Sequence, residues 1–275
     1  MGNLVSVSSA PIAKLGGRRY YDLVGTLTVM KRVWNESVVD GFELQVEPEW
    51  DSENPPLSDG QFADWASVPR YSTAEVLEIV KHEKLPILSV HANRDIGGYL
   101  CSDKNNDREK GKRLIADSLS LAQNLGSKVC TLHLWDTWKP SFDVQGLKEA
   151  LYSSAAGFPE VKASVENIPT HLDGYSPFRL CSLFDSVTLD LRWASMYNEL
   201  DSFKSIIDRV ANVHLRGRLE GNRWLMEKSN FDFYEALAKI RNDWEYSDLL
   251  TLEPEGPMDQ SSMDGFLEAM RSLRQ

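Results

Sequence analysis

Short segments in which apolar and polar side chains alternate recur along the chain, and longer segments of helical character separate them. In residues 161–168, Ala163 and Val165 lie on one side of the backbone. Ser164 and Glu166 lie on the other side, and this period of two predicts a strand with one apolar and one polar face. Seven further segments are predicted as strands: residues 4–8, 41–46, 85–91, 128–134, 187–191, 211–217 and 248–253.

Helices are predicted between these strands. A capping box formed by Ser72 and Glu75 marks one helix start. Residues 47–60 are predicted as an exposed loop, because Pro, Asp, Ser and Asn are frequent there. Residues 219–229 are predicted as a second loop. The predicted helices span residues 26–36, 72–82, 107–125, 144–156, 193–209, 231–241 and 261–273, with a weaker and shorter element at 175–184.

Strands that alternate with helices predict a parallel sheet with right-handed crossovers. Eight strand–helix pairs in 275 residues favour a closed barrel over an open sheet. We therefore expect an α/β protein in which residues 1–275 form a single (β/α)8 TIM barrel domain.

Composition narrows the classes of partner and compartment. The net charge of −11 disfavours nucleic acid as a partner, and no apolar stretch is long enough to span a membrane. The three cysteines form no paired framework, which is typical of a reducing environment, so a cytoplasmic protein is expected.

Metal-capable side chains stand near the carboxyl ends of the predicted strands, where TIM barrels carry their chemistry. Several carboxylates in one barrel mouth repel each other unless a cation neutralises them. Carboxylates combined with a neutral imidazole suit a divalent ion, and Mn²⁺, Mg²⁺, Co²⁺ and Zn²⁺ are the candidates. The side chains are Glu43, His91, His133, Glu166, Asp190, His214 and Glu253.

These strands also carry short motifs of a known superfamily. The chain resembles the xylose-isomerase-like TIM barrels, which include sugar phosphate isomerases and epimerases, inosose dehydratases and enzymes of the endonuclease IV type (AP endonuclease family 2). The resemblance covers essentially the whole chain. The motifs are GFEL at 41–44, VHA at 90–92, VEN at 165–167, LDL at 189–191, VHLRG at 213–217 and LEP at 252–254.

The resemblance implies one divalent metal ion, with Mn²⁺ as the expected ion, bound by Glu166, Asp190, His214 and Glu253. It also implies that Glu166 and Glu253 serve as the acid/base pair. The expected function is a sugar isomerase or epimerase of carbohydrate metabolism that works by proton abstraction and a metal-stabilised enediolate. The expected partner is a sugar or polyol substrate, and assembly into a dimer or tetramer stays open.

Further side chains are expected to contact the substrate. Arg216 or Arg218 is placed to stabilise an oxyanion, with a salt bridge at the barrel mouth as the alternative. His91 and His133 are expected to bind substrate hydroxyls, or else to be structural or ligands of a second metal. Glu43, on the second strand, completes the expected substrate contacts.

The sequence also departs from its relatives. Trp193 stands where many of them carry a histidine, three residues after the aspartate, and its side chain cannot ligate a metal. This disfavours the multi-zinc arrangement of the endonuclease IV type. Arg192 is either a surface residue or a contact for a substrate carboxylate or phosphate. An inosose-type dehydratase and a non-catalytic sugar-binding barrel remain alternatives.

Overall fold

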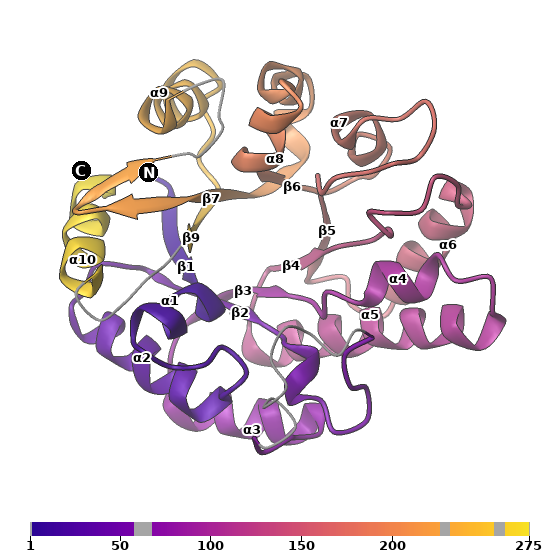
Figure 1. Cartoon of the computed structure of the whole chain (residues 1–275), viewed down its shortest axis with the longest axis horizontal. Helices are drawn as coiled ribbons and strands as arrows, with labels where there is room; N and C mark the ends of the chain where they lie inside the picture. Colours follow the sequence, from indigo (N-terminus) through magenta and orange to yellow (C-terminus); the bar gives the residue numbers. More distant parts are fainter. Residues whose placement is uncertain (1, 58–67, 226–231, 256–261, 275) are drawn as a thin grey trace.

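A computed structural model describes residues 2–57, 68–225, 232–255 and 262–274 of the chain. Figure 1 shows a ring of strands surrounded by helices. The strand order is β6-β5-β4-β3-β2-β1-β9-β7, and pairing between β6 and β7 closes the ring. The pairings that form this ring are all parallel, so the chain is a single TIM barrel of the α/β class, as the sequence predicted.

The eight predicted strands are all present, and one short strand is additional. β8 pairs antiparallel with the end of β7 and lies outside the closed ring. The strands are β1 (Leu4–Ser8), β2 (Gly41–Gln45), β3 (Ile87–His91), β4 (Val129–Leu132), β5 (Lys162–Glu166), β6 (Val187–Asp190), β7 (Val210–Glu220), β8 (Arg223–Leu225) and β9 (Leu249–Glu255).

Helices fill the connections between successive barrel strands. The α-helices are α1 (Ser9–Leu15), α2 (Leu23–Asn35), α3 (Thr73–Glu83), α4 (Ile96–Leu100), α5 (Asn105–Leu125), α6 (Val144–Ala155), α7 (Pro177–Cys181), α8 (Leu191–Met196), α9 (Phe233–Ala238) and α10 (Ser262–Leu273). Among the described residues, η1 (Pro48–Trp50) and η3 (Leu200–Arg209) are 3₁₀-helices, and η4 (Lys239–Asp243) is a π-helix.

Local sequence signals explain where several helices begin and end. The predicted capping box of α3 is confirmed, since the Ser72 hydroxyl accepts from the Glu75 N–H at 3.3 Å and the Glu75 carboxylate accepts from the Ser72 N–H at 2.7 Å. α5 ends at Gly126, whose φ of +78° suits glycine. α2 begins three residues earlier than predicted because Asp22 caps it, accepting from the Gly25 N–H at 3.0 Å.

Three predicted segments were wrong in part. The helix predicted over 193–209 is two elements, α8 and η3, which are separated at Asn198, whose φ of +55° interrupts helical geometry. The loop predicted over 219–229 begins with a hairpin, because β7 continues to Glu220 and turns at Gly221 into β8; residues 226–229 lie outside the described residues. The helix predicted over 231–241 divides into α9 and η4, and residue 231 lies outside the described residues.

The bore of the barrel is polar below the predicted site. Small hydroxyl and amide side chains from neighbouring strands are fully buried there and bond to one another. The Ser6 and Thr251 hydroxyls lie 2.7 Å apart, and Thr251 donates to the Asn212 side chain at 2.9 Å. On the other side of the bore, Thr188 donates to Ser164 at 2.9 Å. Because these polar groups are hydrogen-bonded, their burial costs little, and they support the predicted site residues above them.

The helices pack on the apolar outer faces of the strands and form the core between the two layers. Val7, Leu44, Val90 and Val213 point outward from their strands and are fully buried. None of the described helices combines the length and the apolar character needed to cross a membrane.

We predict that Gly97→Ala destabilises the barrel and that Gly98→Ala does not. A Cβ at Gly97 would overlap the backbone of Trp135, which cannot move without displacing the loop after β4. A Cβ at Gly98 would come within 3.0 Å only of the end of the Leu57 side chain. Overpacking against backbone costs about 1–3 kcal/mol of the free energy of unfolding, measurable by urea denaturation. Equal effects of the two substitutions would contradict this account of the packing.

Candidate metal and active site

The predicted site residues do meet at the carboxyl ends of the strands. His91, Glu166 and Asp190 are the last residues of β3, β5 and β6. His133 follows β4 directly and is the most exposed of the group, with 26 % of its side chain accessible. The six others, which include Glu43, His214 and Glu253, are buried. Parallel strands thus bring together residues that are up to 210 positions apart in the sequence.

Glu166 is held between histidines. Its Oε2 atom lies 3.2 Å from His91 Nε2 and 3.0 Å from His133 Nε2. His214 Nδ1 lies 3.7 Å from the same oxygen. Burial alone would raise the pKa of Glu166, but the neighbouring His133 and His214 rings bring it well below its usual range. The surrounding histidines therefore favour the ionised form of Glu166.

His214 lies at the centre of the buried acidic groups. Its Nε2 is 3.2 Å from Glu43 Oε2, and Glu43 also accepts from Ser89 at 3.0 Å and from Asn212 at 3.2 Å. On the other ring nitrogen, Nδ1 lies 3.6 Å from Glu253 Oε1 and 3.7 Å from Glu166 Oε2. Burial would lower the pKa of His214, but Glu43, Glu253 and Glu166 raise it well above its usual value.

His214 Nδ1 is buried and has no hydrogen-bond partner among the residues that the structure describes. If Nε2 carries the ring proton and donates it to Glu43, then Nδ1 has a free lone pair on the side of Glu166 and Glu253. An imidazole nitrogen and carboxylate oxygens are a donor set that suits a divalent metal ion. The residues therefore fit such an ion.

Two buried triads have ligand atoms within 4.8 Å of one another, and both contain His214. One adds His91 and Glu166, and the other adds Glu43 and Glu253. Both are compatible with a divalent metal site. Of the four predicted ligands, Glu166 and Glu253 each share a triad with His214 but not with each other.

Asp190, the fourth predicted ligand, makes other contacts. Its Oδ1 accepts from the Trp193 N–H at 3.0 Å and caps α8, while its Oδ2 lies 3.5 Å from Arg216 Nη1. Burial raises the pKa of Asp190 to about 7; Arg216 lowers it, whereas Glu166 and Glu253 raise it further. Asp190 belongs to neither triad, and its role as a ligand stays a prediction.

The two predicted arginines lie further along β7. Arg216 donates from Nε to Glu255 Oε1 at 2.6 Å, and Arg218 lies 3.6 Å from Glu220. Their expected contacts with substrate, like those of His91, His133 and Glu43, stay predictions.

Sequence reasoning missed a buried ionic cluster beside the site. Residues 47–60 were predicted as an exposed loop, but Glu47 and Glu49 are each only 2 % exposed. Arg94, after β3, explains the difference, because its guanidinium lies 2.7 Å from Glu47 and 2.5 Å from Glu49. The signal was an arginine three residues beyond the strand that delivers His91. Residues 58–60 lie outside the described residues.

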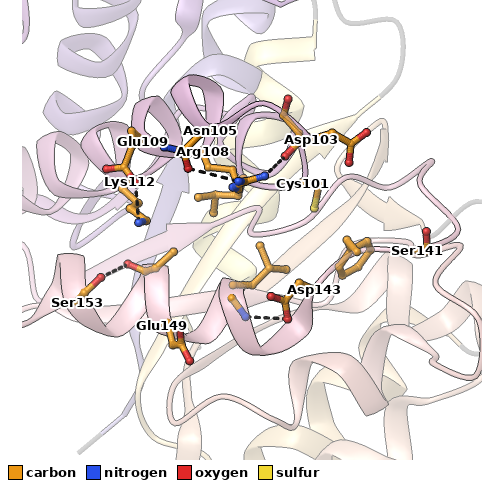
Figure 2. Close-up of a pocket in the computed structure, with 16 residues that line it drawn as sticks. Cys101, Asp103, Asn105, Arg108, Glu109, Lys112, Ser141, Asp143, Glu149 and Ser153 are labelled. Atoms are coloured by element: carbon orange, nitrogen blue, oxygen red, sulfur yellow. Dashed lines mark hydrogen bonds and ion pairs between the residues drawn. The ribbon is translucent and has the colours of Figure 1, made fainter.

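A separate cavity lies between α5 and α6 in the helical layer, with a volume of about 640 Å³ (Figure 2). Its charged groups mostly bond within the lining. Arg108 donates to Asn105 at 3.3 Å, Lys112 to Glu109 at 2.8 Å, and Asp143 caps α6. The lining thus lacks the convergent histidines and carboxylates of the barrel mouth.

Comparisons with solved structures support the fold. A sugar phosphate isomerase/epimerase from Parabacteroides distasonis has 11 % sequence identity and a TM-score of 0.63, over 100 % of this chain and 96 % of that one. A D-allulose 3-epimerase from Methylomonas sp., in complex with D-allulose, has 12 % identity and a TM-score of 0.64, over 99 % and 96 %. Endonuclease IV from Thermus thermophilus has 16 % identity and a TM-score of 0.56, over 98 % and 99 %.

These neighbours identify the fold as that of the xylose-isomerase-like TIM barrels, as predicted from the motifs. No protein-family model matches the chain, and no curated protein matches it in sequence. At such low identity the likeness concerns the fold alone.

We predict that Glu47 makes the stability of the protein depend on pH. Burial raises its pKa to about 7, against the attraction of Arg94, whereas an unburied glutamate titrates near 4.5. The folded state thus binds this proton more tightly than the unfolded state. The resulting stabilisation is complete below about pH 4.5 and is lost as the pH rises through 7. At about 1.4 kcal/mol per pKa unit, the loss is roughly 3 kcal/mol.

The measurement is the free energy of unfolding of the wild type and of Glu47→Gln from pH 4.5 to 8. The difference between the two proteins should change with pH over this range. Glu78→Gln, on the exposed side of α3, is the matched control and should show a difference from the wild type that does not vary. A constant difference for Glu47→Gln would contradict the pKa assigned to Glu47.

Proposed function

We propose that the chain is a divalent-metal-dependent isomerase or epimerase of a sugar or sugar derivative. The observation that carries this proposal is the buried Nδ1 of His214, which lacks a hydrogen-bond partner among the described residues and lies 3.6 and 3.7 Å from two carboxylates. Glu166, His214 and Glu253 would hold the ion, with Asp190 as the fourth ligand. Mn²⁺ is the proposed ion. The substrate would be a small sugar or polyol, and the enzyme would act in carbohydrate metabolism.

A bound divalent ion would polarise a substrate carbonyl and lower the energy of the enediolate that forms when the neighbouring carbon loses its proton. The chain itself supplies the groups that move this proton. Glu166 lies on β5 and Glu253 on β9, and in the ring of strands β6 and β7 stand between them. The two carboxylates therefore approach the space beside His214 from different sides. We infer that one removes the proton and the other returns it.

Other residues would hold this pair in position. His91 and His133 both bond to Glu166 Oε2, so they fix the orientation of the carboxylate and leave its other oxygen free of these contacts. Burial lowers the pKa of His133, which favours the neutral ring, and Glu166 opposes this effect. As the most exposed member of the group, His133 is the residue proposed to bond a substrate hydroxyl.

Arg216 would help to position Glu253. Its Nε lies 3.8 Å from Glu253 Oε2, so it is next to one member of the proposed acid/base pair. Asp190 would be kept in register by Asn167, which donates to the Asp190 carbonyl at 3.2 Å and accepts from the Asp190 N–H at 2.6 Å. These contacts tie the ends of β5 and β6 together.

Deuterium exchange tests the reaction class. We expect the Mn²⁺-loaded protein, incubated in D₂O with a panel of neutral and acidic ketoses, to introduce deuterium at the carbon next to the carbonyl of its substrate. Mass spectrometry and NMR measure the uptake. Glu166→Gln and Glu253→Gln should each slow it by about 10²–10⁴-fold, because each removes one acid/base group.

Glu160→Gln is the matched control, because Glu160 is exposed and pairs only with Lys128 at 3.5 Å among the described residues. It should exchange at the wild-type rate. Sugar binding without exchange would contradict the proposal and favour a non-catalytic sugar-binding barrel. Exchange followed by loss of water would instead identify an inosose-type dehydratase, and cleavage of an abasic duplex would identify an endonuclease.

A further inference from the structure

We propose that Arg192 and Arg216 bind an anionic group, a carboxylate or a phosphate, at the end of the substrate far from the reacting carbon. The proposal rests on the proposed function, because it names the substrate class of the same site. It concerns four residues that we call the rim cluster: Arg192, Trp193, Arg216 and Glu255. Two guanidinium groups share one carboxylate in this cluster, directly beyond the candidate metal ligands.

The rim cluster lies one layer closer to the barrel mouth than the ligands. Arg216 is two residues beyond His214 on β7, and Glu255 is two residues beyond Glu253 on β9. Side chains two apart on a strand share a face, so both point into the barrel, as the ligands do. β7 is the neighbour of both β6 and β9, which brings Arg192, just after β6, beside them.

The distance between the candidate ligands and the rim cluster indicates where the substrate would carry its charge. Two residues of a strand span roughly 7 Å. An anionic group held by the rim cluster would therefore be several bonds from a carbonyl that lies beside the ligands. The terminal carbon of a five- or six-carbon ketose meets this requirement, whereas a group on the carbon next to the carbonyl does not.

Apart from the candidate metal ligands, the rim cluster has one carboxylate for its two arginines. Glu255 is the one acidic partner of Arg192 among the described residues, and its Oε1 also accepts from Arg216 Nε at 2.6 Å. Arg216 has two further acidic neighbours, at 3.5 and 3.8 Å, but both are candidate metal ligands. A substrate anion would supply the missing charge through charge-assisted hydrogen bonds.

Arg94 shows what a fully paired arginine looks like in the same barrel. Its guanidinium has two buried carboxylates, Glu47 and Glu49, within 3 Å. Arg94 therefore clamps two loops and needs no further anion. The rim cluster has the opposite ratio, since its two arginines share one carboxylate that is not a candidate ligand. This ratio distinguishes it from a simple salt bridge, in which one carboxylate pairs with one arginine.

The two guanidinium groups are also held in place before any ligand binds. Arg192 lies 5.0 Å from the centre of the Trp193 ring, and Arg216 lies 5.2 Å from it. Such contacts with an aromatic face stabilise a cation and fix the plane of its fork. The side chains remain 34 % and 26 % exposed, so part of each fork is accessible to a substrate. Planar forks suit carboxylate and phosphate oxygens.

Binding to matched sugars tests the proposal. We would titrate the Mn²⁺-loaded protein by calorimetry with D-fructose 6-phosphate against D-fructose, D-ribulose 5-phosphate against D-ribulose, and D-tagaturonate against D-tagatose. In at least one pair the anionic member should bind about tenfold to a hundredfold more tightly. The phosphate and uronate pairs distinguish the two kinds of anion. D-fructose 1-phosphate, with its charge next to the carbonyl, should gain nothing.

The variants separate recognition from folding and from general charge effects. Arg192→Gln should remove most of the preference for the anionic member, and Arg192→Lys, which keeps the charge beside Glu255, should restore part of it. Arg179→Gln is the matched control, because it removes the same charge from an exposed position on α7. It should leave the preference unchanged.

Three results would overturn the proposal. They are equal affinity within every pair, failure of every anionic sugar to bind at millimolar concentration, and equal losses in Arg179→Gln and Arg192→Gln. The proposed function fails separately. Tight binding of an anionic sugar without deuterium exchange would reject the proposed reaction and support anion binding by the rim cluster. Exchange on neutral sugars alone would support the reaction and reject anion binding.

Discussion

Carboxylates that are shielded from water need positive charge within a few ångströms, and this constraint governs the bore of the barrel. Glu43, Glu166 and Glu253 all lie within 3.7 Å of the His214 ring nitrogens, and all are buried. His214 meets part of this need, since the carboxylates around it raise its pKa well above the usual value. A divalent ion would meet it more completely, and would leave His214 neutral with Nδ1 as a ligand.

The fold supplies the conditions that make such a site stable. A layer of hydrogen-bonded Ser, Thr and Asn side chains lies below the ligands, so the carboxylates rest on groups that are themselves satisfied. Above the candidate ligands, the rim cluster adds two arginines that share Glu255. The bore is thus ordered in three layers along the strands: a polar base, a layer of candidate ligands, and a cationic rim. Because the strands are parallel, each contributes a residue to a given layer at a regular spacing of two.

Much of this order was accessible from the sequence. Alternation predicted all eight barrel strands, and a metal-capable residue near the end of most of them indicated where the candidate ligands meet. The partners of those residues were not accessible. Asp190 reads as a ligand in the sequence, but in the structure it bonds to Arg216 and to the first turn of α8. Glu47 and Glu49 read as parts of a polar loop, because nothing local to them indicates that Arg94 lies opposite. Pairing between loops depends on tertiary placement, which periodicity does not encode.

One divalent ion is proposed to lie in the bore beside His214 Nδ1. Anomalous diffraction from crystals of the Mn²⁺-loaded protein tests it most directly, because manganese scatters anomalously and the other atoms of the site do not. The account predicts one strong peak between Glu166, His214 and Glu253, and the same map would show whether Asp190 leaves Arg216 to join them. Crystals saturated with Mn²⁺ that show no peak in the bore would contradict the claim and, with it, the reaction proposed for this barrel.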